Sequence, residues 1–454
     1  MNTVALPIET ETLFGGGRLG ACIGVVALVS LLAFEAMAVA AAMPAIAAAL
    51  DGLGLYALAF GGMLATSVLG MVLAGRSCDR HGSYRATALG LAVFGAGLLL
   101  AGFADSMGWL VAGRIVQGLG SGMLGVALYV GMGQLVPPSL HPRLFALLAA
   151  AWVVPGLAGP LAAAGLVEHL GWRAVFLVVA AAVPLAAALL LPAFGRLPLP
   201  ARAGGEAAAP GRPIAWAALA ALGALLLHGA SMAGAAVRVL PALALGLAAA
   251  CVAASRLLPR GSLRAAPGLP AVIALRGLLA AAFASAEVFV PLVLTREQGW
   301  SLGRAGLALS AGAVLWSCGS AVQARIGPVR DRRRALQAGF LTVAGGITLA
   351  VVPLLTGLSA WILVAGWALA GFGIGLAFPM LSVLTLSLSP PAEQGRNASA
   401  LQLSDALCSS AALAVAGACF NLAGASGPQG YVLVLALALT LALAGALLGR
   451  RAFT

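Results

Sequence analysis

Few side chains in this sequence could do chemistry, and most of those that could are ionisable groups inside apolar runs. Glu35 interrupts LLAFEAMAVAAAMPAIAAAL, Glu287 lies in LLAAAFASAEVFVPLVL, and Asp405 lies in ASALQLSDALCSS. Arg114 is the deepest cation of such a run, and Gln117 follows it on the next turn. Acids in apolar surroundings can take up protons or pair with cations. These five residues are therefore candidate proton-coupling or substrate-binding groups.

Each candidate also has a structural interpretation. Glu35 could stay neutral and hydrogen-bond a neighbouring helix, and Arg114 could stabilise its own span as an ion pair or a carbonyl clamp. Asp405 could cap a local polar cluster with Gln402 and Ser404. A functional role is favoured for Glu35, because a charged side chain at a bilayer centre costs about 2.5–3.5 kcal/mol on insertion scales.

The composition places the chain in a membrane. Of its 454 residues, 62% are hydrophobic and 8% are charged, with a mean hydropathy of +1.06. A soluble domain carries roughly a quarter charged residues, so this chain has too little polar surface for water. We expect a lipid bilayer as its surroundings, and we read the net charge of +12 as loop arginines that set topology rather than as a nucleic-acid site.

Several protein classes are excluded by residue types that are missing. All 25 basic residues are Arg, which removes the lysine that P-loop ATPases and Schiff-base proteins need. The six cysteines have no C-x-x-C spacing and the four histidines are scattered, so no metal or other cofactor is expected. No metal-ligand motif and no paired carboxylates in one helix are found, which argues against a membrane enzyme.

The apolar runs predict fourteen membrane spans, grouped as six, two and six, each near the twenty or so residues that cross a bilayer core. They cover residues 19–48, 53–75, 86–104, 109–135, 144–167, 173–193, 214–233, 239–257, 269–295, 303–325, 335–355, 359–386, 397–421 and 429–449. A linker rich in Pro, Gly and Arg at 197–213 follows the first set.

The fold class predicted is thus an all-α membrane protein of two six-helix bundles with two additional central helices. The predicted divisions are 1–194, 195–268 and 269–454. Counted from a cytoplasmic N-terminus, nineteen arginines fall on the cytoplasmic side and four on the other. This bias predicts a multi-pass protein of the cytoplasmic membrane with both termini in the cytoplasm.

The two sets of six spans echo each other. GRIVQGLGSG at 113–122 and GWALAGFGIG at 366–375 place four glycines at the same spacing. A basic loop follows the second span of each set, GRSCDRHGSYR at 75–85 and ARIGPVRDRRR at 324–334. Two related bundles with a binding site between them near the midplane are typical of secondary transporters.

Four motifs in the sequence resemble those of one known family of membrane transporters. The loop pattern Gly75, Asp79, Arg80, Gly82 and Arg85 resembles the signature between the second and third spans of the major facilitator superfamily. The other three resemble patterns of its drug-exporting members: Arg114, Gln117, Gly118 and Gly120 in the fourth span, Pro155, Gly156, Gly159 and Pro160 in the fifth, and Glu35 nine residues before Pro44 in the first. The extra central pair looks like the fourteen-span drug:proton antiporter branch.

This resemblance implies alternating access, a small-molecule substrate, protons as the coupling ion and a monomer. It also implies that the loop residues Asp79, Arg80 and Arg85 latch the cytoplasmic side shut in the outward-facing state, by charge-assisted hydrogen bonds between helix ends. The favoured hypothesis is proton-coupled efflux of small amphipathic compounds, such as drugs, antibiotics or metabolites. The alternatives are a facilitator or proton-coupled importer of a nutrient and, less well supported, a membrane sensor or enzyme.

Overall fold

The protein is an all-helical bundle. The computed structural model describes Gly15 and residues 18–198, 212–230, 236–326, 329–390, 393–424 and 427–453, so most of the expected linker at 197–213 lies outside the described residues. Its α-helices are α1 Leu19–Ala49, α2 Tyr56–Gly102, α3 Met107–Leu135, α4 His141–Ala150, α5 Val153–Leu170, α6 Ala174–Phe194, α7 Arg212–Ala230, α8 Ala236–Leu257, α9 Leu269–Arg296, α10 Leu302–Gln323, α11 Val329–Thr356, α12 Trp361–Ser387, α13 Gln394–Leu422 and α14 Pro428–Leu448.

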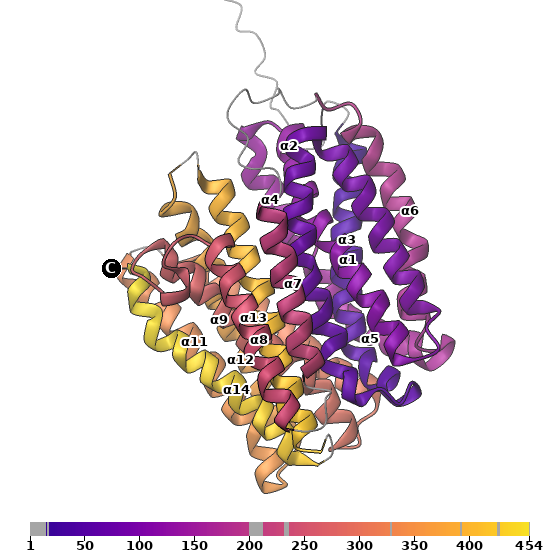
Figure 1. Ribbon diagram of the computed structural model, residues 1–454, viewed down its shortest axis with the longest axis vertical. Coiled ribbons are helices and arrows are strands. Elements are labelled where there is room, and N and C mark those ends of the chain that lie inside the picture. Colours follow the sequence, from indigo (N-terminus) through magenta and orange to yellow (C-terminus); the bar gives the residue numbers. More distant parts are fainter. Residues whose placement is uncertain are drawn as a thin grey trace, which may run out of the picture.

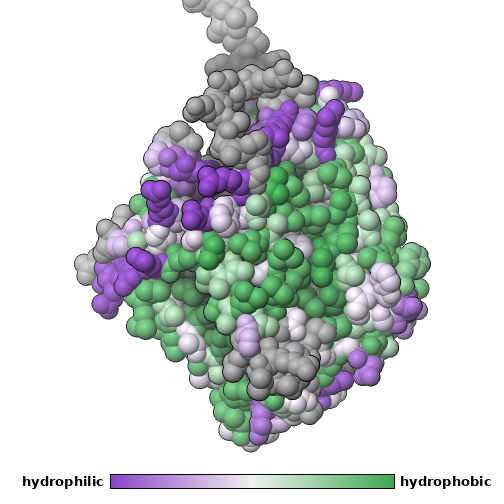
Figure 2. Space-filling model, in the orientation of Figure 1, coloured by the Kyte–Doolittle hydropathy of each residue, from purple (hydrophilic) through white to green (hydrophobic). Residues whose placement is uncertain are grey.

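The surface confirms a membrane protein that crosses the bilayer many times. Figure 2 shows a broad hydrophobic belt below an upper edge where hydrophilic residues gather. Within a bilayer, helices satisfy their own backbone hydrogen bonds, which is why apolar sequence of this length folds as helix. By length and composition, the described part of the chain has twelve helices able to cross a membrane.

The prediction of fourteen spans is therefore not supported. The count is lower by two, and one of the two is explained by α2. The expected spans 53–75 and 86–104 fall almost entirely within this one helix of 47 residues. Its backbone breaks at Gly82, where φ is 79° and ψ is 169°. Glycine adopts this conformation readily because it has no Cβ atom. The break divides α2 into a first limb, 56–81, and a second limb, 83–102.

The second difference lies in the central pair. Helix α7 is long and apolar enough to cross a membrane, but in α8 the apolar stretch among the described residues is Ala244–Leu257. That stretch is shorter than the twenty or so residues that a span needs. Figure 1 shows α7 in front, between the N-terminal half (α1–α6) and the C-terminal half (α9–α14).

Glycines let the helices pack at very short range, and they do so in the same way in both halves. A Cβ atom on Gly118 or Gly122 of α3 would lie 2.1 or 2.0 Å from a backbone oxygen of the first limb of α2. Likewise, a Cβ atom on Gly371 or Gly375 of α12 would lie 2.2 or 2.1 Å from a backbone oxygen of α10. Small residues permit such approaches where lipid gives no hydrophobic drive to association.

The second limb of α2 follows the same repeat. It meets Gly113 and Gly120 of α3, as α11 meets Gly366 and Gly373 of α12. The matching partners are Met63 and Gly312, Ser67 and Trp316, Phe94 and Val343, and Ala101 and Ala350, each pair 249 positions apart. The glycine echo in the sequence is therefore a structural repeat, in which the two limbs of α2 correspond to the separate helices α10 and α11.

The two halves meet mainly in one layer of the molecule. Hydrogen bonds between them join Asn421 to the carbonyl oxygen of Gly54 (3.0 Å), Tyr56 to that of Val288 (2.9 Å), Ser410 to that of Gly61 (2.8 Å) and Ser310 to that of Leu157 (2.8 Å). Three of these bonds join the first part of α2 to the later parts of α9 and α13, and the fourth joins α10 to α5. The bonds of α2 lie at the opposite end of its first limb from the basic loop at 75–85.

Helix α7 covers one seam between the halves. It packs on both α2 and α13. Its His228 is buried against Gly61, where a Cβ atom would lie 2.0 Å from the imidazole Nε2. The other seam, between α5 and α10, is formed without α7.

The glycine packing predicts a contrast between two alanine variants of α3. Gly122→Ala should lower the thermal unfolding temperature of the detergent-purified protein, since overpacking costs typically 1–3 kcal/mol. Gly125→Ala is the matched control, because a Cβ atom there meets nothing within 4 Å. It should leave the temperature unchanged or raise it slightly, since alanine favours helix. Equal losses in both variants would contradict this packing.

Candidate functional site

A charge cluster lies in the N-terminal half and unites three of the residues expected from the sequence. Arg114 of α3 forms an ion pair with Glu35 of α1 through Nη1 and Oε1. The same Nη1 donates to Oε1 of Gln117 at 2.9 Å, and Nε donates to the carbonyl oxygen of Ala59 in α2 at 3.1 Å. The cluster therefore ties α1, α2 and α3 together around one guanidinium.

The cluster is sealed from solvent. Glu35 is 1% exposed, Arg114 3% and Gln117 0%. A buried charge pair is stable only when good geometry and further hydrogen bonds offset the loss of hydration. Here Oε2 of Glu35 and Nε2 of Gln117 have no hydrogen-bond partner in the described part of the protein. The carboxylate thus keeps one oxygen able to take a proton or a hydrogen-bond donor.

A second ion pair, between a buried arginine and a half-buried acid, lies in the C-terminal half, where the sequence drew attention to one partner only. Nε of Arg276 in α9 donates to Oδ2 of Asp405 in α13 at 2.9 Å. Its Nη1 donates to the carbonyl oxygen of Phe378 and to Oγ of Ser382, both at 3.0 Å. The expected link of Asp405 to Ser404 is replaced, since Ser404 donates to the carbonyl oxygen of Ile273.

Arg276 is a site residue that sequence reasoning did not single out. It stands in an apolar run, as Arg114 does, which was the available signal. Its pairing with Asp405 joins positions 129 residues apart, so only the fold reveals it. Like Glu35, Asp405 keeps one oxygen, Oδ1, that is buried and has no partner within the described ranges.

Glu287 belongs to neither cluster. It lies in α9, is half-buried, and forms no hydrogen bond or ion pair with the described residues. The five expected candidates are therefore split into a cluster of three, one half of a second pair, and a carboxylate without a counter-charge.

The loop residues expected to form a latch lie on the surface. Asp79, Arg80 and Arg85 are exposed, and none takes part in the three ion pairs of the described residues. Gly75 is helical with open space beside it, and Gly82 provides the break in α2. Gly82 and Arg85 also line a cavity of about 810 Å³ between this loop and the end of α6.

The Pro- and Gly-rich motif of α5 lies in a seam between the halves. Pro155, Gly159 and Pro160 are buried. A Cβ atom on Gly156 would touch Ala313 of α10 at 3.4 Å, and one on Gly306 of α10 would lie 2.9 Å from the carbonyl oxygen of Pro160. The motif thus lets α5 approach α10 closely, and Gly159 does the same toward α1 at Met37.

Ion pairs inside the spans, and glycines that let two halves of an apolar helical bundle approach closely, are features of a membrane transporter. The chain belongs to the Major Facilitator Superfamily, whose family model matches residues 24–428. This match confirms the transporter class, and the protein is not an enzyme, since its relatives are named as transporters.

The names of the relatives agree with the transporter class, and a solved structure shares the fold. A probable multidrug-efflux transporter of Mycobacterium tuberculosis is 31% identical over 424 residues, which cover 89% of this chain and 88% of that protein. A multidrug efflux pump of Staphylococcus aureus is 25% identical over 169 residues, covering 36% of this chain and 37% of the pump. The crystal structure of a POT family transporter in complex with 5-aminolevulinic acid shares the fold, with a TM-score of 0.70, 15% identity, and coverage of 98% of this chain and 99% of that one.

The second ion pair leads to a stability prediction. Arg276→Gln should destabilise the protein by on the order of 3 kcal/mol, because it leaves the carboxylate of Asp405 without its counter-charge. Adding Asp405→Asn should recover part of the loss. Unfolding of the single and double variants in detergent measures the coupling as a double-mutant cycle.

The exposed pair Arg396–Glu393 is the matched control, with side chains 71% and 44% exposed. Arg396→Gln should change stability by less than about 1 kcal/mol, since surface pairs contribute little. A loss in Arg396→Gln as large as that in Arg276→Gln would show that charge removal, rather than burial of the pair, sets the effect.

Proposed function

We propose that the protein exports small amphipathic compounds across the cytoplasmic membrane in exchange for protons, by alternating access. The observation that carries the proposal is the sealed cluster of Glu35, Arg114 and Gln117, with one carboxylate oxygen left without a partner. Ionisable groups inside spans are expensive and usually mark ion pathways. The multidrug-efflux names of the relatives support the direction of transport.

The cluster suggests how a proton could drive the cycle. When Glu35 binds a proton, its attraction to Arg114 is lost, because only the charged carboxylate forms the ion pair. Arg114 then keeps its bonds to Gln117 and to the carbonyl oxygen of Ala59. The interaction between α3 and α1 is weakened, while the hydrogen bond from Arg114 to α2 remains. This difference favours a rearrangement of α1. Release of the proton restores the pair.

The conformation supports an inward-facing state. The bonds from α2 to α9 and α13 lie at the far end of the first limb of α2 from the basic loop at 75–85, and the bias of arginines supports a cytoplasmic position for that loop. The halves are thus held together on the outer side. Asp79, Arg80 and Arg85 form no ion pair with the described residues, which accords with this state, since a cytoplasmic latch is open when the protein faces inward.

The finer topology is also part of the proposal. Counting the two limbs of α2 separately and taking α8 as a crossing gives fourteen spans, with residues 1–194 and 269–454 as the moving bundles. Correspondence of the limbs with α10 and α11 supports the first step. The even count, with the arginine bias, supports a cytoplasmic position for both termini.

The first test concerns Glu35. In proteoliposomes with an acidic exterior, substrate efflux should carry protons inward in the wild type, and Glu35→Gln should reduce this coupled flux to the level of empty liposomes. Glutamine keeps the shape and cannot exchange a proton. Glu168→Gln, at an exposed carboxylate of α5, is the control and should behave as wild type. Unchanged coupled flux in Glu35→Gln would remove Glu35 from the mechanism.

The second test concerns the latch. Asp79→Asn should slow turnover several-fold while substrate affinity stays near wild type, because the change acts on closing the cytoplasmic side and not on the binding groups. Transport rate and equilibrium binding are measured on the same preparation. A loss of affinity without a change in maximal rate would contradict a latch role for Asp79.

A further inference from the structure

The cavity of about 810 Å³ beside the basic loop at 75–85 has no part in the transport cycle proposed above. Two walls enclose it. One wall is the break of α2 with its neighbours, residues 81–85. The other is formed by the last three turns of α6 and the residues after it: Pro184, Ala187, Ala188, Leu191, Pro192, Phe194, Gly195, Leu197 and Pro198. Ligand sites of proteins commonly have volumes of this size.

The wall formed by α2 is basic. Arg85 carries a positive charge and His81 has an imidazole that can gain one, and both side chains are exposed. None of the lining residues that the structure describes is acidic. Asp79, the one acid of the loop, does not belong to them. The charges of this wall therefore favour an anion.

The helix break adds polar groups that suit an anion. Ser83 is the first residue of the second limb of α2, and the start of a helix attracts negative charge. Ser83 lines the cavity and is buried, and its Oγ has no hydrogen-bond partner among the described residues. Buried hydroxyl groups usually have such a partner. An acceptor oxygen from outside the chain would supply it.

The wall formed by α6 is apolar and continues into the membrane. Its lining side chains are those of proline, alanine, leucine and phenylalanine. Leu185 and Leu189, in the same turns, are exposed. Since α6 is long and apolar enough to cross a bilayer, these leucines face lipid. The cavity thus joins a basic loop to a lipid-facing helix.

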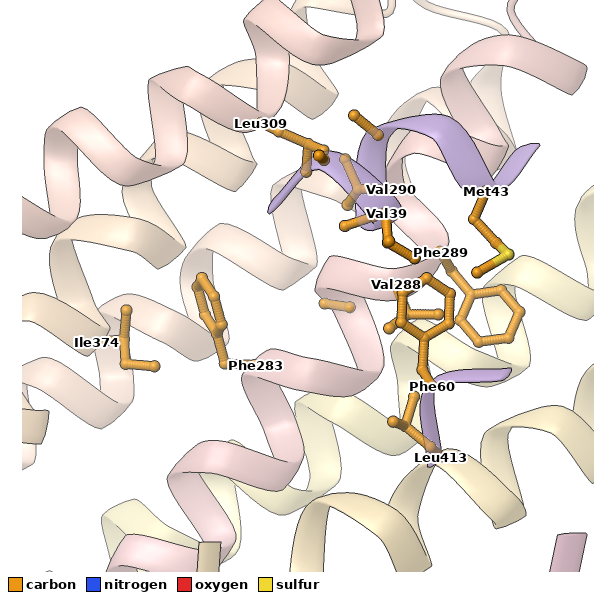
Figure 3. Close-up of a cluster of buried hydrophobic side chains, with 14 of the residues drawn as sticks. Val39, Met43, Phe60, Phe283, Val288, Phe289, Val290, Leu309, Ile374 and Leu413 are labelled. Carbon is orange, nitrogen blue, oxygen red and sulfur yellow. The ribbon is translucent and has the colours of Figure 1, made fainter. Parts of the chain in front are cut away.

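The cavity is separate from the contact between the two halves. Figure 3 shows that contact filled by apolar side chains of both, with Val39, Met43 and Phe60 of the N-terminal half near Val288 and Phe289 of the C-terminal half. None of these five residues lines the cavity, whose described lining comes from α2, α6 and the residues after α6. An occupant of the cavity is therefore not a compound held between the halves.

We propose that this cavity binds an anionic phospholipid. The phosphate lies among Arg85, His81 and Ser83, and an acyl chain follows the apolar wall of α6. Basic pockets between membrane-spanning helices on the cytoplasmic side suit anionic headgroups. A free phosphate ion would use the basic wall alone and leave the apolar wall uncovered, whereas a lipid covers both. The site holds whatever the direction and coupling of transport.

Native mass spectrometry of the detergent-purified protein tests the site. Added phosphatidylglycerol should give an adduct of one lipid on the wild type. Phosphatidylethanolamine with the same acyl chains should bind much more weakly, because its amine cancels the charge of the phosphate. Arg85→Gln should lower the affinity for phosphatidylglycerol about fivefold, as expected for one arginine near a membrane surface. Ala188→Trp fills the cavity, leaves every charge in place, and should lower the affinity at least as much.

Arg334→Gln is the matched control. Arg334 lies 249 positions after Arg85, which is the spacing of the structural repeat, and it ends the basic loop of the other half. It is exposed, as Arg85 is, and does not line the cavity. This variant should bind phosphatidylglycerol as the wild type does. Thermal unfolding checks that each variant is folded.

Three results would overturn the site: no phosphatidylglycerol adduct on the wild type, equal affinity for the two lipids, or the same loss in Arg334→Gln as in Arg85→Gln. Wild-type affinity in folded Ala188→Trp would also reject it, because the lipid would then bind elsewhere. Displacement of the adduct by an equimolar amount of inorganic phosphate would show that the site takes the free ion and not the lipid.

Discussion

A carboxylate and a guanidinium buried together inside lipid-embedded helices set the main constraint on this protein. Glu35 and Arg114 are each sealed from water, so neither can lose the other without a large penalty. The ion pair is stabilised by the hydrogen bonds of Arg114 to the carbonyl oxygen of Ala59 and to the amide oxygen of Gln117. These bonds form only when α1, α2 and α3 hold fixed positions. The glycine contacts that bring α3 against both limbs of α2 are what make these positions possible.

The two ion pairs divide the molecule chemically as well as spatially. In the N-terminal half the arginine comes from α3 and the acid from α1, while in the C-terminal half the arginine comes from α9 and the acid from α13. The helical scaffold repeats closely, as the matching glycine contacts show. The positions of the paired charges do not follow that repeat. The two halves therefore share their helix packing and differ in where the charged side chains lie.

Much of the fold could be predicted from sequence, because bilayer thickness and helix geometry leave few choices for long apolar runs. The glycine echo and the basic loops also predicted the repeat. Less could be predicted about the site. Glu35 and Arg114 were visible as isolated charges, but their contact depends on how α1 and α3 are rotated, which hydropathy does not encode. The pairing of Arg276 with Asp405 depends on packing between distant segments, and the helix break at Gly82 depends on local backbone shape. The count of fourteen spans is not supported at that break or at α8.

Helix α7 makes the two seams unequal. It lies across α2 and α13, with the imidazole of His228 seated in the notch left by Gly61, beside the bond from Ser410. Nothing comparable spans α5 and α10 in the described residues. If the two halves rock against each other, α7 would limit the separation of α2 from α13, whereas α5 and α10 could separate further. Compounds dissolved in the membrane would then find the seam between α2 and α13 covered by α7, and would reach the interior through the seam between α5 and α10.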